Sequence, residues 1–457
     1  MLKTRSRLST SLLLCAAAIG LGALAFVPEQ AFAVPSFARQ TGMPCAACHT
    51  VAPELTPFGR QFKLRGYTMG EQLKSKPFPN DLPLAMGLQL GNTQVSDPHK
   101  GANASTDFPR ANKTIVQQVA LYYAGRIYGK LGALAQYNWD GIGQAWGAEM
   151  VDIRYADSAV FWGKGLVYGV TINNSPAVED VWNTSPMWFF PHLQDAGILP
   201  MNTSLMDMTL NNQVGGVGVY ADYDGQFYVE VGVLRDGHTS IFRPLNSGDA
   251  LTTAVAGTAP HMRVAWEKDW GENSAEIGMH ALRADIFPDP TKLSGPADRF
   301  TDLALDGQYQ RIGMQHLFSL DAFFDTEKRD WNASLPLGLA SNASDRLDTV
   351  KVSAHYFYER KVGGGIGYFD YWGDRDMLKY GMGGGMPSAA GNATGSPDAR
   401  GWMAEADYLP LPNNQNIKIG MRYTAYTTFN GSADDYNGFG RNASDDNALF
   451  LYLWALY

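Results

Sequence analysis

Hydrophobic and polar residues alternate along most of this chain with the period of two that is typical of β-strands with one apolar and one polar face. In the segment 301–310, Leu303 and Leu305 share one face, whereas Asp302 lies on the other. About sixteen such segments recur between residues 84 and 457. No apolar run in this part of the chain reaches the length of a transmembrane helix, so the pattern predicts an all-β fold.

The connections between these segments alternate between short and long. Short turns are expected at Gly129-Lys130 and at residues 223–226, 270–273, 311–313 and 360–362. Long polar loops are expected at residues 95–114, 174–212, 237–260, 285–299, 326–347, 372–400 and 430–446. An even number of antiparallel strands, with short turns at one rim and long loops at the other, is typical of bacterial outer-membrane barrels. We therefore predict a transmembrane β-barrel of about sixteen strands over residues 84–457.

The parity of the strands also predicts the topology. With an even number, both chain ends lie at the short-turn rim, which faces the periplasm in such barrels, and the long loops are extracellular. A lumen of this size can be an aqueous channel or can hold a plug.

Residues 1–33 have the features of a secretory signal peptide. Three basic residues precede an apolar run over residues 12–26, and Ala31-Phe32-Ala33 supplies a small-residue cleavage site. The mature chain is therefore expected to start at Val34. Cys15 would leave with the signal, so that Cys45 and Cys48 would be the remaining cysteines.

Between the signal and the barrel lies the motif Cys45-Ala46-Ala47-Cys48-His49, which has the spacing of a covalently attached c-type haem. A thioredoxin-like redox pair would need a βαβ context, and a zinc site would need a second pair of ligands, but the chain has only 3 cysteines. We therefore expect one haem c in the segment 34–83, with Cys45 and Cys48 as attachment residues and His49 as the proximal iron ligand. This segment is expected to plug the lumen.

The sixth iron ligand is harder to assign. Met69 follows a short expected helix and is the best-placed thioether, and Met86, at the start of the barrel, is the alternative. Methionine ligation would raise the haem potential. Ligation by a second histidine stays open, because alternation places His280 and His355 on lumen-facing positions.

Composition argues against one class of partner. The formal net charge is −9 and no run of basic residues occurs, so the chain lacks the positive surface that binds nucleic acid.

Several stretches around the motif resemble a known family. Residues 35–43 (PSFARQTGM) lead into the haem motif, and residues 53–60 (PELTPFGR) and 66–68 (GYT) follow it. Together with residues 173–176 (NNSP) and 180–184 (DVWNT), they are similar to the fused monohaem cytochrome c-porin family of outer-membrane iron oxidases.

The resemblance implies an electron-transfer protein with Fe(II) oxidase activity, which takes electrons from extracellular Fe(II) and passes them to a periplasmic cytochrome or other soluble carrier. Two alternatives remain open from the residues themselves. One is an outer-membrane porin with a haem-containing plug, and the other is a metal reductase that carries electrons outward. The direction of flow depends on the haem potential and on the donor, and the sequence determines neither.

Overall fold

The computed structural model describes most of the chain outside its first residues. The predicted signal peptide, residues 1–33, lies outside the described part. The described residues are 35–69, 83–98, 111–185, 189–191, 200, 202–237, 239, 241–246, 248, 252–381 and 391–457.

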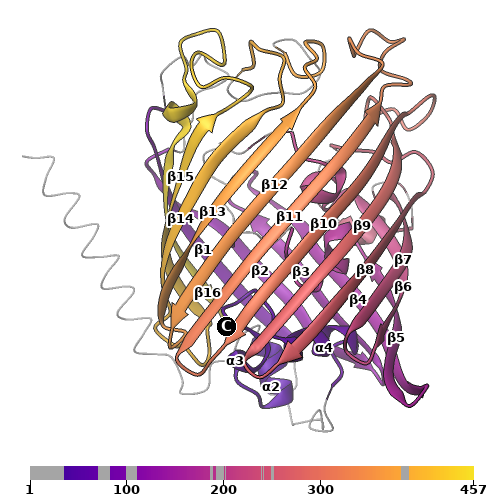
Figure 1. Ribbon diagram of the computed structural model, residues 1–457, viewed down its shortest axis with the longest axis vertical. Helices are drawn as coiled ribbons and strands as arrows, with labels where there is room; N and C mark the ends of the chain where they lie inside the picture. Colours follow the sequence, from indigo (N-terminus) through magenta and orange to yellow (C-terminus); the bar gives the residue numbers. More distant parts are fainter. Residues whose placement is uncertain are drawn as a thin grey trace, which may run out of the picture.

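Within these residues, sixteen antiparallel strands close into a barrel (Figure 1). Each strand pairs with its neighbours in the sequence, and the first strand pairs with the last, Leu88 opposite Ala455. This confirms the predicted architecture. The strands are β1 (Leu84–Val95), β2 (Thr114–Tyr128), β3 (Leu131–Asp140), β4 (Ala145–Phe161), β5 (Lys164–Asn173), β6 (Val214–Tyr223), β7 (Phe227–Asp236), β8 (Ala259–Trp270), β9 (Asn273–Ile286), β10 (Asp298–Ile312), β11 (His316–Asp330), β12 (Ser344–Tyr358), β13 (Val362–Gly373), β14 (Ala399–Tyr408), β15 (Ile417–Thr428) and β16 (Ala448–Leu456).

The alternation along the strands separates an apolar outer surface from a polar lumen. On β10, Leu303 and Leu305 are 45% and 50% exposed, whereas Asp302 and Asp306 are buried. Exposed aromatic residues gather at the ends of strands near the short turns: Tyr128, Trp162, Phe227, Trp270, Tyr358, Tyr408 and Tyr457. An apolar outer band with an aromatic girdle is the surface of a barrel that spans an outer membrane.

The two rims differ as the sequence predicts. The connections β2–β3, β4–β5, β6–β7, β8–β9, β10–β11 and β12–β13 are short, and most of the others are long loops at the opposite rim (Figure 1). The connection β3–β4 is an exception on the long-loop side, because it has only the residues 141–144.

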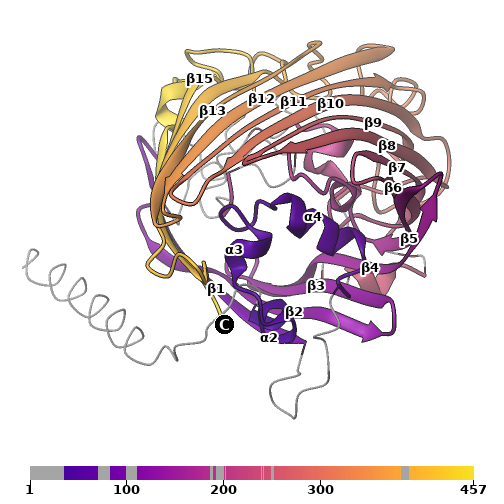
Figure 2. The ribbon, with the colours of Figure 1, turned by 60° about the horizontal axis from the view of Figure 1, so that its bottom comes forward.

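The haem-motif segment forms short helices at the short-turn rim. They are α2 (Pro35–Thr41), α3 (Cys45–Cys48) and α4 (Pro57–Leu64), and Figure 2 shows α3 and α4 inside the ring of strands. The start of α4 follows from its sequence, because the Thr56 hydroxyl accepts a hydrogen bond from Gly59 N and proline occupies the first helical position. No helix among the described residues is long and apolar enough to cross a membrane.

The connection between β5 and β6 folds into the lumen. It carries η1 (Pro176–Glu179) and η2 (Leu205–Thr209), and its contacts reach the opposite wall. Asp207 pairs with Lys351 on β12, and Leu205 N donates to the Glu327 carboxylate on β11 over 2.8 Å. The loop and the helical segment therefore occupy the lumen together, and both are bonded to the barrel wall.

The main anchor of the helical segment is Arg60 on α4, which is buried. Its Nε and Nη2 lie 3.0 and 2.9 Å from the two carboxylate oxygens of Glu267 on β8. Its other donors bond the Ser274 hydroxyl, the Gln310 amide oxygen and the Leu55 backbone oxygen. One guanidinium thus ties the segment to three adjacent strands.

Removing this guanidinium should loosen the segment without opening the barrel. In Arg60→Ala, the Glu267 carboxylate stays buried without its main partner, which costs about 3 kcal/mol. We expect the amide protons of α4 to exchange about a hundredfold faster in detergent-solubilised protein, measured by hydrogen exchange.

The matched control is Lys164→Ala, which removes the exposed pair between Lys164 and Asp224 at a turn of the same rim. Such surface pairs contribute little to stability, so protection of α4 should stay as in the parent protein. Equal protection in Arg60→Ala would show that Arg60 does not hold the segment.

Candidate functional site

A cavity of about 500 Å³ lies between the helical segment, the wall formed by β16 and β1 to β4, and the β5–β6 loop. This volume is in the range of cofactor and ligand sites. Its apolar lining includes Phe37, Phe62, Tyr67, Tyr122, Leu134, Phe190 and Trp454, and its polar lining includes Gln89, Gln118, Gln136 and Glu149. Cys45, Cys48 and His49 all line this cavity, so the structure brings the three predicted haem-binding residues together.

The chemistry of these three side chains suits a covalently held haem. Both cysteines are present as thiols, and burial raises the pKa of the Cys48 thiol to about 11, so that it is neutral at pH 7. The Nδ1 atom of His49 lies 3.2 Å from the backbone oxygens of Pro53 and Glu54, which can only accept, so Nδ1 carries the proton. This leaves the Nε2 lone pair for a metal, and a backbone carbonyl on the other ring nitrogen is the arrangement that orients histidine ligands.

Burial also determines the charge of His49. Removal from water lowers the pKa of the imidazole, against a smaller opposing effect of its bonds to the Glu54 and Pro53 carbonyls. The ring is therefore neutral at pH 7, as an iron ligand must be.

Close packing of α4 on α3 holds the motif in place. Thr56 N donates to the Cys48 backbone oxygen over 2.9 Å, and the Thr56 hydroxyl donates to the Ala47 oxygen over 2.8 Å. A Cβ atom on Gly59 would lie 2.1 Å from the Cys48 oxygen. Only glycine at this position lets α4 approach the haem motif so closely.

Aromatic packing forms one side of the cavity. The rings of Phe37 and Phe62 meet edge to face at 5.1 Å, and Phe37 stacks on Tyr67 at 5.3 Å. The Tyr67 hydroxyl donates to Asp152 on β4 over 2.5 Å, which fixes the ring to the barrel wall. Phe58, one turn before Phe62, does not line the cavity and is 36% exposed.

The residues that line the cavity include one lysine, Lys63 of α4. Lys63 Nζ donates to the Val178 backbone oxygen over 2.7 Å, and burial lowers its pKa to about 8. Lys63 is therefore a cation that is costly to bury and that an anionic group of a ligand would stabilise.

Of the two methionines expected as the sixth ligand, the structure contradicts the alternative, Met86. Met86 lies on the outward face of β1 and is 53% exposed, because it shares that face with Leu84 and Leu88; it is therefore excluded as a ligand of a haem in the lumen. Met69 follows α4 but does not line the cavity. His280 is buried and His355 is partly buried on the lumen-facing positions that alternation predicts, and neither lines this cavity.

Three other methionines do line the cavity, namely Met43, Met150 and Met208. Alternation along the sequence does not predict that Met150 faces the cavity. The register between β3 and β4 shifts at Gln136/Tyr137, and the resulting bulge interrupts the alternation along β4. Met208 belongs to η2 in the long β5–β6 loop, for which periodicity gives no side-chain direction.

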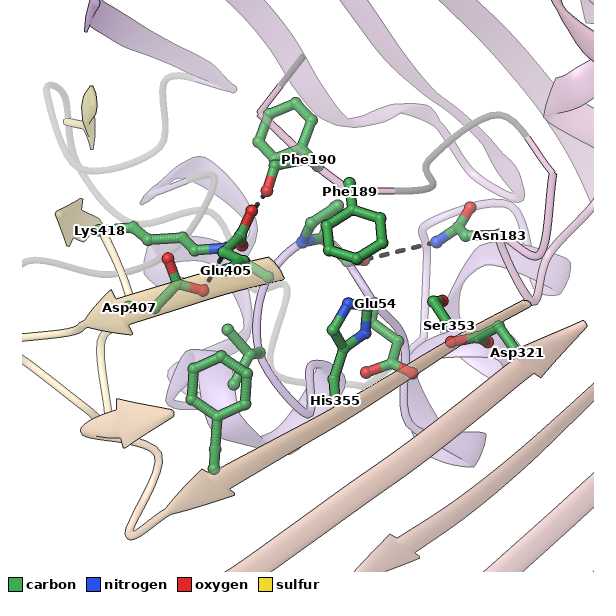
Figure 3. A pocket seen from close by; sticks show the side chains of 14 residues that line it. Glu54, Asn183, Phe189, Phe190, Asp321, Ser353, His355, Glu405, Asp407 and Lys418 are labelled. Atoms are coloured by element: carbon green, nitrogen blue, oxygen red, sulfur yellow. Dashed lines mark hydrogen bonds and ion pairs between the residues drawn. The ribbon is translucent and has the colours of Figure 1, made fainter. Parts of the chain in front are cut away.

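A second cavity of about 60 Å³ adjoins the first across the loop 51–54. Figure 3 shows the side chains of Glu54, Asp321 and His355 close together in it. Asn183 and Phe190 line both cavities, and Asn183 Nδ2 donates to the Pro53 oxygen at 3.5 Å. The loop that orients His49 is thus also in contact with the lumen loop.

Substitution of Gly59 should separate α4 from the haem motif. In Gly59→Ala, the added methyl group overlaps the Cys48 oxygen, so the bond from Thr56 N to that oxygen should break. We expect hydrogen exchange to show loss of protection at the Thr56 amide. Gly165→Ala is the control, because a Cβ there meets no atom within 4 Å. Unchanged protection in Gly59→Ala would contradict the described packing.

No protein-family model matches the chain, and no curated protein matches it. Several solved outer-membrane protein structures are similar to it. OmpF of Salmonella typhi, in complex with daunomycin, is 12% identical, with 82% of this chain and 97% of that chain covered and a TM-score of 0.47. The anion-selective porin of Comamonas acidovorans is 12% identical, with 82% and 98% covered and a TM-score of 0.43. OmpT of Vibrio cholerae is 10% identical, with 82% and 97% covered and a TM-score of 0.42.

Proposed function

We propose that this protein is an outer-membrane c-type cytochrome that transfers electrons across the membrane, from extracellular Fe(II) to a periplasmic electron carrier. The observation that carries the proposal is the placement of Cys45, Cys48 and His49 on one cavity inside the barrel. A lumen that serves only for diffusion needs no such set of residues at its short-turn end.

In this proposal the chain's own residues hold the cofactor. Cys45 and Cys48 would supply the two thioether attachments, His49 Nε2 would be one iron ligand, and Met43, Met150 and Met208 are the thioethers among the lining residues that could supply another. When bound, a haem supplies one-electron exchange. The apolar and aromatic lining excludes water, and Lys63 offers a positive charge to the propionates.

The arrangement of the lumen supports transfer of electrons without transfer of ions. The helical segment lies inside the barrel at the short-turn end, and the β5–β6 loop, bonded to β11 and β12, lines the same cavity. Each Fe(II) that becomes Fe(III) releases one electron, which the periplasmic carrier accepts. The poorly soluble ferric product then stays outside. The resemblance of residues 35–43 and 180–184 to the iron-oxidase family supports Fe(II) as the donor.

The barrel itself favours a second candidate, a porin whose haem segment is a plug. Its wall of sixteen strands in the described residues is wide enough for a water-filled channel. Conductance in planar bilayers separates the two candidates. The cytochrome proposal predicts a conductance far below that of an open pore of this size, whereas a porin should conduct at that level.

Covalent haem is the first expectation to test. A haem-stained denaturing gel of outer membranes should show a band for this protein, and Cys45→Ala with Cys48→Ala should abolish it while the barrel still assembles. The assembly check is the heat-modifiable mobility of the barrel on the same gel. A haem band that persists in the double variant would contradict the assignment of the attachment residues.

Donor and direction are tested in oriented outer-membrane vesicles. Ferrous iron in a membrane-impermeant chelate should reduce the oxidised haem from the extracellular side, as followed by absorbance. The cysteine double variant is the control for reduction at other centres. If correctly assembled, oxidised protein stays oxidised in excess ferrous iron, the iron-oxidase proposal fails; reduction only by a periplasmic donor would indicate a metal reductase.

A further inference from the structure

A cluster of buried ligand-type side chains lies in the lumen apart from the three residues of the haem motif. Asp180 follows η1 in the β5–β6 loop, His280 is on β9 and Asp306 is on β10. Each offers a ligand atom, and these atoms lie within 4.8 Å of one another. The three residues are no more than 5% exposed. Two strands and a distant loop thus bring one imidazole and two carboxylates to a single point.

The charges around this point do not balance. Arg263 Nη2 lies 2.8 Å from Asp306, 3.0 Å from Glu276 and 3.4 Å from Asp180. One guanidinium therefore faces three carboxylates, which leaves a formal charge of −2 when all three are ionised. Buried uncompensated charge is costly, so the cluster would be stabilised by a further cation.

Unused polar atoms point to the same conclusion. His280 Nε2 has no hydrogen-bond partner, and the nearest carboxylate oxygen, on Asp306, is 3.7 Å away. The Glu276 Oε2 atom also lacks a hydrogen-bond partner, although Glu276 is only 6% exposed. Buried polar atoms normally have a hydrogen-bond partner. An imidazole nitrogen that has none and lies close to carboxylates is in the environment that a metal ion requires.

Neighbouring groups orient the two carboxylates. The Thr184 hydroxyl lies 2.8 Å from an oxygen of Asp180 and 2.8 Å from an oxygen of Asp306. The backbone amides of Thr184 and Trp182 donate to Asp180 over 2.8 and 3.1 Å. Hydrogen bonds of this kind fix the direction of ligating carboxylates in metal sites.

We propose that Asp180, His280 and Asp306 bind one divalent transition-metal ion in the lumen. A mixed imidazole and carboxylate set suits Fe(II), Mn(II), Co(II) or Zn(II) better than Ca(II) or Mg(II), which prefer oxygen ligands alone. The identification of the occupant as ferrous iron, the electron donor, rests on the proposed function; the site itself rests on the cluster.

The position of the cluster suits a donor site. Val178 and Asn183, which flank Asp180 in the sequence, line the cavity that holds the haem motif. The Cα atoms of Val178 and Asp180 can be no more than about 7 Å apart. An ion at the cluster would thus lie next to that cavity, and the helical segment anchored by Arg60 lies between it and the short-turn rim.

The site is tested with Co(II) as the probe on purified full-length protein. Calorimetry and the visible absorption of Co(II) should show one bound ion per chain, and His280→Ala should weaken binding at least tenfold. This substitution changes no carboxylate, so the pairs of Arg263 stay intact. Asp306→Asn, checked for barrel assembly by heat-modifiable mobility, should weaken binding as well.

The matched control is His355→Ala, which removes a partly buried histidine of the lumen outside the cluster and should bind Co(II) as the parent does. No binding by the parent protein, or equal binding by His280→Ala, would overturn the site.

Failure of the site and failure of the proposed function give different results. If Co(II) binds and His280→Ala abolishes the binding, but ferrous iron reduces the haem equally fast in both proteins, the site stands and ferrous iron as its occupant is overturned. If ferrous iron never reduces the haem while Co(II) binding depends on His280, the site stands and the iron-oxidase proposal fails. If the haem of His280→Ala is reduced more slowly than that of the parent at low ferrous iron concentration, the result supports both the site and ferrous iron as its occupant.

Discussion

The position of the haem motif depends on one buried guanidinium, that of Arg60. It bonds the Leu55 oxygen within its own segment and the Glu267 carboxylate on the barrel wall. Glu267 also accepts the indole proton of Trp182 at 2.5 Å, so the lumen loop and the helical segment share one carboxylate. Removing one partner of a buried ion pair leaves the other charge uncompensated, which is costly. The shared Glu267 carboxylate therefore couples the helical segment to the lumen loop, and both line the cavity. The cavity between the helical segment and the loop keeps its shape only when both are bonded to the same wall.

The barrel could be predicted from the sequence because its geometry imposes a simple rule. Every strand of a closed barrel has one face toward lipid and one toward the lumen, so a period of two recurs, and antiparallel closure makes the connections alternate. The same rule places Phe450 and Tyr452 inward, and both are buried. Applied to β1, it would also have placed Met86 with Leu84 on the lipid face and excluded it as a ligand.

The details of the site could be predicted only in part. The spacing of Cys45, Cys48 and His49 is local chemistry, so the sequence alone brings them together. The methionines on the far side of the cavity depend on a bulge in β4 and on the fold of the β5–β6 loop, and neither leaves a periodic signal. In the cluster of Asp180, His280 and Asp306, the loop aspartate precedes the two strand residues by 100 and 126 positions, and only closure of the barrel brings it to strands β9 and β10.

A barrel that passes electrons but not ions would need an occupied lumen. This would explain why the helical segment and the β5–β6 loop both lie inside the barrel. A hydrated cation that moved past the helical segment would have to displace buried pairs such as Arg60 with Glu267, and each uncompensated charge would cost several kcal/mol. In the proposed function, an electron would need no such displacement, because the proposed metal cluster lies next to the cavity of the haem motif. The excess negative charge around Arg263 would attract a cation from the loop side, while the bonded helical segment would prevent it from going further. In the proposed function, a barrel wall that can form a pore would instead serve as the scaffold of a closed partition.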